Sequence, residues 1–191
     1  MPSDTKSAIL AAAEQAVRRK GYDGFSYADL SKKVGIRKAS IHYHFPTKAD
    51  LSVALMQRYM TEFSSACTEI EKQNTTGAAR LSGLINYYRL AIDDGRCLCL
   101  CVSFSGSRDS LSEALVTQIR RFREETLQWI ERAFDLGRAD GSVLNVAGPA
   151  QEAAATLALL EGAQLMARAQ IDPSRFDNAT VLLHHRLRVA A

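Results

Sequence analysis

The stretch 26–51 constrains the fold of this chain more than any other, because it carries closely spaced start and stop signals for helices. Ser26 and Asp29 have the spacing of a capping box, in which the Ser hydroxyl accepts a hydrogen bond from the backbone N–H three residues on. Gly35 suits the left-handed backbone conformation that ends a helix and turns the chain. The pattern predicts two short helices joined at Gly35, a helix-turn-helix.

A second capping arrangement follows Pro46, where Thr47 and Asp50 repeat the spacing of the first. One helix must therefore end near Phe45 and the next begin at Thr47, which confines the middle helix to residues 37–45. This short helix is dense in Arg, Lys, Ser, His and Tyr, side chains that reach DNA phosphates and base edges. A short helix presented after a tight turn can enter the major groove, so the segment favours a DNA-binding regulator.

The same residues resemble the tetracycline-repressor-like (TetR/AcrR) family of transcriptional regulators. The family signature, Gly-apolar-x-x-x-Ser/Thr-Ile/Leu-Tyr-x-x-Phe-x-x-Lys, stands here as Gly35-Ile36-Arg37-Lys38-Ala39-Ser40-Ile41-His42-Tyr43-His44-Phe45-Pro46-Thr47-Lys48. The close match covers residues 5–55, and it has two departures. His42 stands where the family usually has Tyr, and Ser31 stands where it usually has Ala.

Side-chain chemistry and this resemblance together assign DNA-contacting roles within the head. The predicted phosphate contacts are Ser26, Tyr27, Tyr43, His44 and Lys48. The predicted base-edge or groove contacts are Arg37, Lys38, Ser40 and His42. An Arg can bind guanine through two parallel hydrogen bonds, and Lys48 lies at a helix start, whose dipole favours phosphate. The alternative for some of these side chains is that they only solvate an exposed helix. Ile41 and Phe45 are expected in the core.

The charge distribution agrees with a DNA-binding head. The formal net charge is only +3, but residues 1–50 carry nine Lys/Arg against five Asp/Glu. Residues 51–191 carry fifteen against sixteen. The basic surplus therefore lies entirely in the part that contains the helix-turn-helix, as phosphate binding requires.

The rest of the chain is expected to be helical, since no segment shows sustained period-two alternation. We predict an all-α fold of about nine helices, with a DNA-binding domain at 1–48 and an effector-binding and dimerisation domain at 49–191. A helix at about 97–105, a capping box formed by Ser110 and Glu113, and a last helix that reaches the C-terminus belong to this prediction. No signal peptide or long apolar run is visible, so we expect a cytoplasmic protein without a membrane partner.

The last two helices are the expected assembly surface. Residues 150–169 are rich in Ala and Leu with few charges, and the final segment carries several large aliphatic residues. These helices could also pack only within their own domain. In the family that the chain resembles, however, they pair with their two-fold mates in a four-helix bundle. One short recognition helix reads few bases, so we expect a homodimer on a palindromic DNA operator.

A small-molecule effector pocket is expected among the middle helices. Its predicted lining combines adaptable apolar side chains with a polar anchor: Met60, Phe63, Tyr87, Tyr88, Phe104, Gln118, Phe122 and Trp129. Each of these aromatic residues could instead be plain core. We expect a two-state repressor, in which the effector favours a second spacing of the DNA-binding heads and releases the operator.

Cys97, Cys99 and Cys101 are the second unusual feature of the sequence. Cysteines are often buried as small apolar residues, which is the default interpretation. The alternative is a thiol sensor of electrophiles or oxidants, because Arg96 beside Cys97 could favour the thiolate and some family members sense electrophiles in this region. No ligand spacing suggests a metal, and no cofactor or catalytic motif is present. A helical ligand-binding protein that does not bind DNA is the remaining alternative, but it leaves the basic head unexplained.

Overall fold

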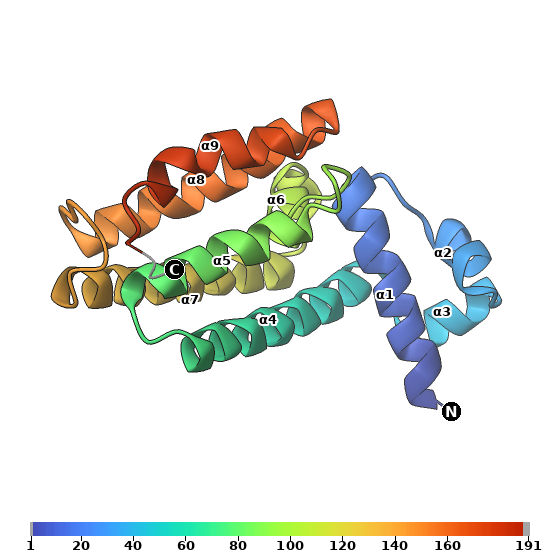
Figure 1. Ribbon diagram of the computed structural model, residues 1–191. Helices are drawn as coiled ribbons and strands as arrows, with labels where there is room; N and C mark the ends of the chain where they lie inside the picture. Colours follow the sequence, from blue (N-terminus) through green and yellow to red (C-terminus); the bar gives the residue numbers. More distant parts are fainter. Residues whose placement is uncertain (1, 189–191) are drawn as a thin grey trace. The chain divides into compact units, whose positions relative to one another are not determined.

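The computed structural model describes residues 2–188, and within this range the chain is helical apart from its connecting segments (Figure 1). The described elements are α1 (Pro2–Lys20), α2 (Tyr27–Val34), α3 (Lys38–His44), α4 (Lys48–Gln73), α5 (Gly77–Ala91), α6 (Leu100–Ser105), the 3-10 turn η1 (Arg108–Ser110), α7 (Glu113–Ala139), α8 (Pro149–Gln170) and α9 (Ser174–His184). The predicted all-α class and the number of α-helices are confirmed for the described residues.

The chain forms two compact units, each built from two segments. The first contains the residues up to Thr61 together with Leu100–Arg121, and the second contains Glu62–Cys99 and the residues from Phe122 onward. The polypeptide therefore passes from one unit to the other within α4, just before α6, and within α7. The predicted boundary at residue 48 separates a DNA-binding domain from an effector-binding and dimerisation domain, and this functional division stays a prediction.

The first unit holds the short helices over the inner face of α1. Ile9, Ala13 and Val17 of α1 are fully buried, and so are Leu30 of α2 and Ile41 of α3. α6 packs against α1 in the same unit. Ile41 and Phe45 are core residues, as predicted. Burial of these apolar faces, rather than helix propensity, stabilises helices as short as α2 and α3.

In the second unit, α8 and α9 lie along each other and pack against α5 (Figure 1). The N-terminus of α5 is capped by residues distant in sequence. The Asp140 carboxylate accepts from the Gly77 N–H at 2.9 Å, and the Ser142 hydroxyl accepts from the Ala78 N–H at 2.9 Å. These bonds satisfy helix-start N–H groups that have no partner within α5.

Three details of the predicted helix boundaries are wrong. The helix expected at about 97–105 begins only at Leu100, because Asp93, Asp94 and Gly95 all adopt positive φ and turn the chain. The start of α7 is capped by Ser112, whose hydroxyl accepts from Leu115 N–H, and not by Ser110, which ends η1.

The third detail concerns the end of α9. This helix ends at His184, whereas the prediction continued it to the C-terminus, whose last three residues lie outside the described range. Beyond α9, Leu187 forms an isolated antiparallel bridge with Val143, which is the one β-type pairing among the described residues. The C-terminal segment is thus held against the α7–α8 connection. None of the described helices is both long and apolar enough to cross a bilayer.

Candidate nucleic-acid interface

Local capping builds the helix-turn-helix as the sequence predicts. The Ser26 hydroxyl accepts from the Asp29 N–H at 3.3 Å, and the Asp29 carboxylate accepts from the Ser26 N–H at 2.8 Å. The Ser26 hydroxyl also donates to the Asp29 carboxylate at 2.7 Å, and this bond, followed by the one from the Ser26 N–H, lowers the pKa of the Asp29 carboxyl. Gly35 has φ 75° and ends α2 with its N–H bonded to the Ser31 carbonyl. Thr47 and Asp50 form the equivalent cap at α4.

α3 presents most of its side chains to solvent. Ile41 is its one buried residue and anchors the helix to the core. Arg37, Lys38, His42 and Tyr43 are exposed, whereas Ser40 and His44 are half-buried. Tyr43 is 84% exposed, more than any other large hydrophobic side chain among the described residues. An exposed aromatic ring beside cations suits a nucleic-acid surface, because it can stack on bases or bond to a phosphate through its hydroxyl.

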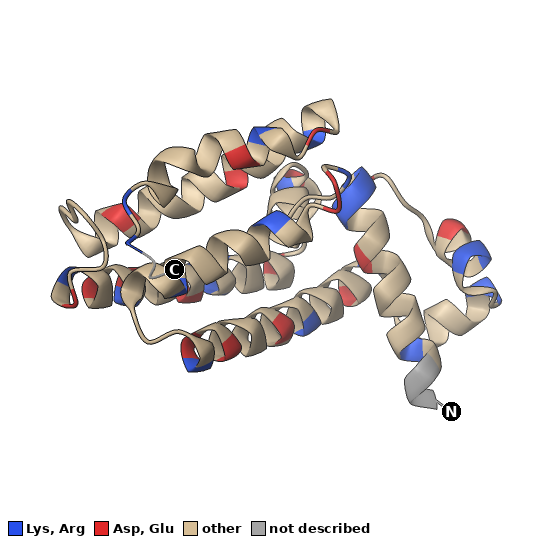
Figure 2. Cartoon of the chain, in the orientation of Figure 1, with Lys and Arg blue, Asp and Glu red and all other residues tan. Residues whose placement is uncertain are grey.

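The cations of this helix are available to a partner. No ion pair joins Arg37 or Lys38 to a carboxylate within the described part of the chain. Figure 2 shows Lys and Arg positions on α2 and at the start of α3, with a single acidic position on α2. Arg37 lies at the N-cap of α3 and makes no side-chain capping bond, so its guanidinium is not used to hold the helix.

Tyr27 has an internal role that the sequence did not indicate. Its ring is buried, and its hydroxyl lies 2.9 Å from the Phe45 carbonyl oxygen and 2.6 Å from that of Thr47. Burial, followed by the nearby Asp50 carboxylate, raises the pKa of the Tyr27 phenol to about 12. The hydroxyl proton is therefore committed to the turn between α3 and α4.

Lys48 is also held inside the first unit. Its ammonium donates to the Phe25 carbonyl at 2.9 Å and lies over the rings of Tyr22, at 4.6 Å, and Phe25, at 4.3 Å. Burial lowers the pKa of this ammonium. These contacts join the start of α4 to the α1–α2 connection across 23 residues of sequence. No local pattern could have found them, because the partners are a backbone carbonyl and aromatic faces.

His42 and Ser26 are exposed but have neighbours of their own. The His42 ring lies 4.8 Å from the Tyr27 ring, and its Nδ1 is 3.1 Å from the Pro46 carbonyl oxygen. The Ser26 hydroxyl is 2.7 Å from the Asp29 carboxylate. The structure thus brings all nine predicted DNA-contact residues into one unit. It leaves Arg37, Lys38 and Tyr43 as the most open of them.

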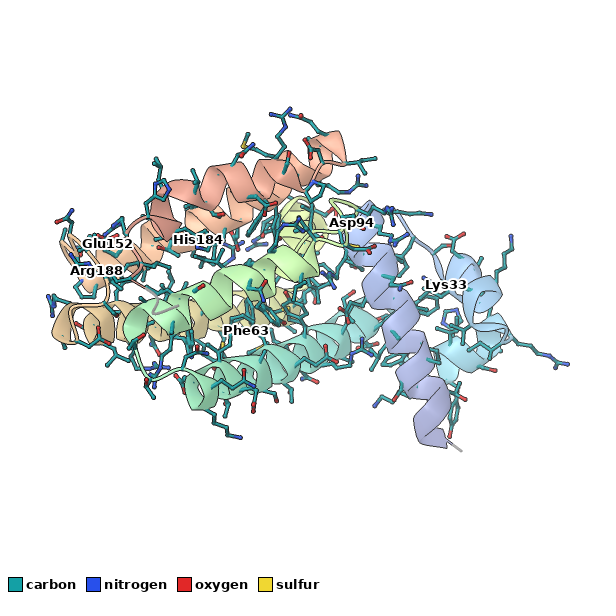
Figure 3. All side chains as sticks on the ribbon, viewed as in Figure 1. Lys33, Phe63, Asp94, Glu152, His184 and Arg188 are labelled. Carbon is teal, nitrogen blue, oxygen red and sulfur yellow. The ribbon has the colours of Figure 1, made fainter. Side chains whose placement is uncertain are left out.

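The predicted effector residues are divided between the units. Phe63 makes edge contacts with Tyr87 at 5.6 Å, Tyr88 at 6.5 Å and Phe122 at 5.0 Å, all within the second unit. Figure 3 shows Phe63 where α4 and α5 run side by side. Trp129, also in this unit, has a buried Nε1 without a hydrogen-bond acceptor among the described residues.

The other three predicted effector residues, Met60, Phe104 and Gln118, belong to the first unit. Phe104 is fully buried against Tyr22, and Gln118 has a buried Oε1 that lacks a donor among the described residues. The second unit also contains a pocket of about 350 Å³ between α5 and α9. It is lined by Arg89, Asp177, His184 and their neighbours, and by none of the predicted effector residues.

Cys97, Cys99 and Cys101 are all buried free thiols. Cys97 Sγ lies 3.8 Å from the Asp93 carboxylate, and the Cys99 N–H donates to the side chain of Gln164 at 2.7 Å. Cys101 Sγ is 3.9 Å from the Met56 sulfur. The described residues contain no group of His, Cys, Asp or Glu side chains that could hold a metal.

An apolar surface runs along α8 and α9. Leu165 and Met166 of α8 are half exposed, and Leu182 of α9 is 73% exposed. Ala154, Ala155 and Ala158 are exposed on α8 as well. Figure 2 shows both helices mostly in tan, with few charged positions. An apolar surface of this kind, on helices that lie side by side, marks a protein-protein contact.

Comparison with known proteins agrees with this geometry. Residues 9–55 match the family model described as bacterial regulatory proteins, tetR family. The crystal structure of a TetR-family transcriptional regulator from Agrobacterium tumefaciens superposes with a TM-score of 0.93 at 32% sequence identity, covering 99% of this chain and 100% of that one.

Two further matches concern one relative. The HTH-type transcriptional repressor NemR of Escherichia coli (strain K12) is 25% identical over 181 residues, which cover 92% of this chain and 90% of that protein. The crystal structure of the reduced form of E. coli NemR superposes with a TM-score of 0.81 at 23% identity, over 98% and 99% of the two chains.

Proposed function

Because this chain belongs to the TetR family of transcriptional regulators, we propose that it binds a palindromic operator as a homodimer and is released by a small-molecule effector. Family membership confirms the predicted class, a DNA-binding regulator and not an enzyme. Membership of this family also argues against the alternative of a helical ligand-binding protein that does not bind DNA. Repression is the proposed sign of regulation, since the full-length relative NemR is a repressor.

The observation that carries the proposal is the exposure of α3. A helix anchored by one buried residue, with Arg37, Lys38, His42 and Tyr43 exposed, offers the side chains that DNA recognition uses. We propose Arg37, Lys38, Ser40 and His42 as base-edge or groove contacts. Ser26, Tyr43, His44 and Lys48 are proposed at phosphates. The hydroxyl proton of Tyr27 is bonded within the protein, so Tyr27 is proposed to act on DNA through the turn that positions α3, a task that Lys48 shares.

The apolar surface of α8 and α9 supports the homodimer. One α3 helix covers a few base pairs, and two copies related by a two-fold axis read two half-sites of a palindrome. Leu165, Met166 and Leu182 would be buried against the same residues of a second copy, as in a self-complementary interface. The proposed division of labour is residues 1–48 for DNA and residues 49–191 for effector binding and assembly. Since its partner is chromosomal DNA, the proposed location is the cytoplasm.

The effector is proposed to contact the aromatic cluster of the second unit. Phe63, Tyr87, Tyr88 and Phe122 supply apolar faces, and the buried Trp129 N–H would donate to an acceptor on the ligand. Met60, Phe104 and Gln118 remain in the proposed set as residues of the first unit. For the effector to release DNA, it must bind the DNA-free arrangement more tightly than the DNA-bound one.

A thiol sensor on the same scaffold is the second candidate. Cys97 lies just beyond the turn at Asp93, Asp94 and Gly95, and its Sγ is 3.8 Å from the Asp93 carboxylate, so modification of its thiol would disturb this turn. The relative NemR has been solved in a form named as reduced, which supports the candidate. An electrophile would add to the sulfur as the thiol loses its proton. The triple variant Cys97→Ser, Cys99→Ser, Cys101→Ser should then bind DNA normally and ignore the electrophile; an unchanged response in that variant removes the candidate.

Footprinting on the DNA that flanks the protein's own gene tests the proposed function. A symmetric protected site, lost when a candidate effector is added, is the expected result. Protection without symmetry would contradict the homodimer on a palindrome. No protection at any concentration, alongside affinity for random duplex that does not change with salt, would contradict DNA binding itself.

A further inference from the structure

The turn between α3 and α4 is held by two side chains that act on consecutive carbonyl groups. The Tyr27 hydroxyl donates to the carbonyl oxygens of Phe45 and Thr47. The His42 Nδ1 lies 3.1 Å from the carbonyl oxygen of Pro46, the residue between these two. The two rings also contact each other at 4.8 Å. His42 is therefore oriented by two contacts while its ring remains exposed to solvent.

This arrangement fixes the position of the proton on neutral His42. A backbone carbonyl can only accept a hydrogen bond, so Nδ1 must be the nitrogen that carries hydrogen. In the neutral ring Nε2 then holds a lone pair, and it becomes a donor only when the ring is protonated. Within the described residues Nε2 makes no other contact, so it is the atom left for a partner outside the protein.

The groups around His42 leave few others that could titrate near neutral pH. On α2, the pKa of the Tyr27 phenol is raised to about 12, so this group stays protonated near neutral pH. At the start of α4, Asp50 is bound in its cap and Lys48 donates to the Phe25 carbonyl. On α3 itself the charged neighbours are Arg37 and Lys38, and His44 is the second imidazole.

We propose that His42 couples DNA binding to proton uptake, because its Nε2 bonds to an acceptor on DNA only when the ring is protonated. The acceptor is a phosphate oxygen or the N7 or O6 atom of guanine, none of which can donate to a neutral Nε2. The inference rests on the proposed function, since it requires that α3 contacts DNA. It makes operator affinity highest at mildly acidic pH.

The size of the effect follows from linkage. An acceptor on DNA favours the charged form of the His42 ring, so the complex takes up protons as it forms. The stabilisation is therefore largest at the acidic end of the tested range, and it is lost as the pH rises through the range in which the bound ring deprotonates. If the bound ring holds its proton one pH unit more firmly in each copy, the affinity of the dimer changes by up to about 100-fold.

Fluorescence anisotropy with a labelled duplex tests the proposal, using the upstream DNA of the protein's own gene between pH 5.5 and 8.0 at constant ionic strength. Wild-type affinity should fall by about 10- to 100-fold across this range. In His42→Asn the amide can still donate to the Pro46 carbonyl, but nothing replaces Nε2, so the affinity should be low and independent of pH. His185→Gln, an exposed imidazole of the second unit with no proposed contact to DNA, is the control and should keep the wild-type profile.

Three outcomes would overturn the inference: wild-type affinity that is flat with pH, a pH dependence that survives in His42→Asn, or one that disappears in His185→Gln. His42→Gln provides a second non-titrating variant, should circular dichroism show that His42→Asn is unfolded. Failure of the inference is distinguishable from failure of the proposed function. In the first case the protein binds duplex DNA without a pH dependence, and in the second it does not bind at all.

Discussion

Two exposed surfaces of this protein differ in chemistry. α3 carries exposed Arg37, Lys38, His42 and Tyr43 around one buried anchor, whereas α8 and α9 expose Ala, Leu and Met with few charges. The first surface attracts a polyanion at long range, and the second gains free energy only by excluding water against a matching apolar face. The difference is the reason that we propose two partners of different kinds, DNA for α3 and a second copy of the chain for α8 and α9.

Charge reversal on α3 should give the largest effect. Arg37→Glu replaces a DNA-seeking cation with an anion in each copy, and we expect affinity for operator DNA to fall by at least about 100-fold. Folding should survive, because a carboxylate at the start of a helix is favourable. Electrophoretic mobility shift measures the loss. Lys72→Glu, at the exposed end of α4, is the matched charge reversal and should bind within a few-fold of wild type.

Charge placed on the apolar surface should separate the two copies. The double variant Leu165→Glu, Leu182→Glu sets like charges against each other in a two-fold interface, so we expect a monomer at micromolar concentration in analytical ultracentrifugation. Gln128→Glu, at an exposed position of α7, is the control and should stay dimeric. A dimer that persists in the double variant would place the interface elsewhere.

The arrangement of α8 and α9, and with it the apolar surface, also depends on Arg186 in the segment that follows α9. Arg186 donates twice to the Glu152 carboxylate, at 2.9 and 2.6 Å, and also to the carbonyls of Leu144 and Asn145. Figure 3 labels Glu152 near the start of α8 and Arg188 in the segment beyond α9. Arg186→Met should cost about 2 kcal/mol of unfolding free energy, because it leaves Glu152 largely buried and unpaired. Urea denaturation measures it. Arg175→Met breaks an exposed pair and should cost less than about 1 kcal/mol.

The ion pair between Arg186 and Glu152 also predicts a dependence of stability on pH. Hydrogen bonds from Arg186 lower the pKa of the Glu152 carboxyl below that of an unfolded chain. The stabilisation is therefore present above about pH 4.3, the ordinary Glu value, and is lost as the pH falls through the lower folded value. The unfolding free energy of Glu152→Gln should therefore change less between pH 7 and pH 3.5 than that of the wild-type protein. An identical pH profile in the variant would show that the pair contributes nothing.

The two helix caps offer the smallest and most selective comparison. Ser26→Ala and Thr47→Ala each remove one hydroxyl cap, so each should cost about 1 kcal/mol of stability. Ser26 is also a proposed phosphate contact and Thr47 is not. DNA affinity should therefore fall several-fold more in Ser26→Ala, at equal thermal stability. Equal affinities would leave Ser26 with a capping role alone.

Local signals allowed the head to be predicted from sequence. The caps at Ser26 and Thr47, the left-handed Gly35 and the buried Ile41 each depend on residues within a few positions of each other. The roles of Tyr27 and Lys48 did not emerge, because their partners are backbone carbonyls 18 to 23 residues away. The same reason hid the capping of α5 by Asp140 and Ser142 across more than 60 residues.

The errors in the second half of the chain have a different physical cause. The segment that carries the cysteines looked helical, but positive φ at Asp93 and Asp94 delays α6 until Leu100. Aspartate adopts this conformation at modest cost, so composition alone does not reveal it. The Cys99 N–H is satisfied instead by Gln164 of α8, a fully buried side chain that no sequence pattern had singled out.

The salt dependence of binding to duplex DNA tests the central claim most directly, since it reports whether exposed cations of the head displace counterions from phosphate. A plot of log affinity against log salt should be linear and steep, with a slope of about −0.9 for each phosphate neutralised. A flat plot for the wild-type protein would contradict the account of α3 as the DNA-binding surface.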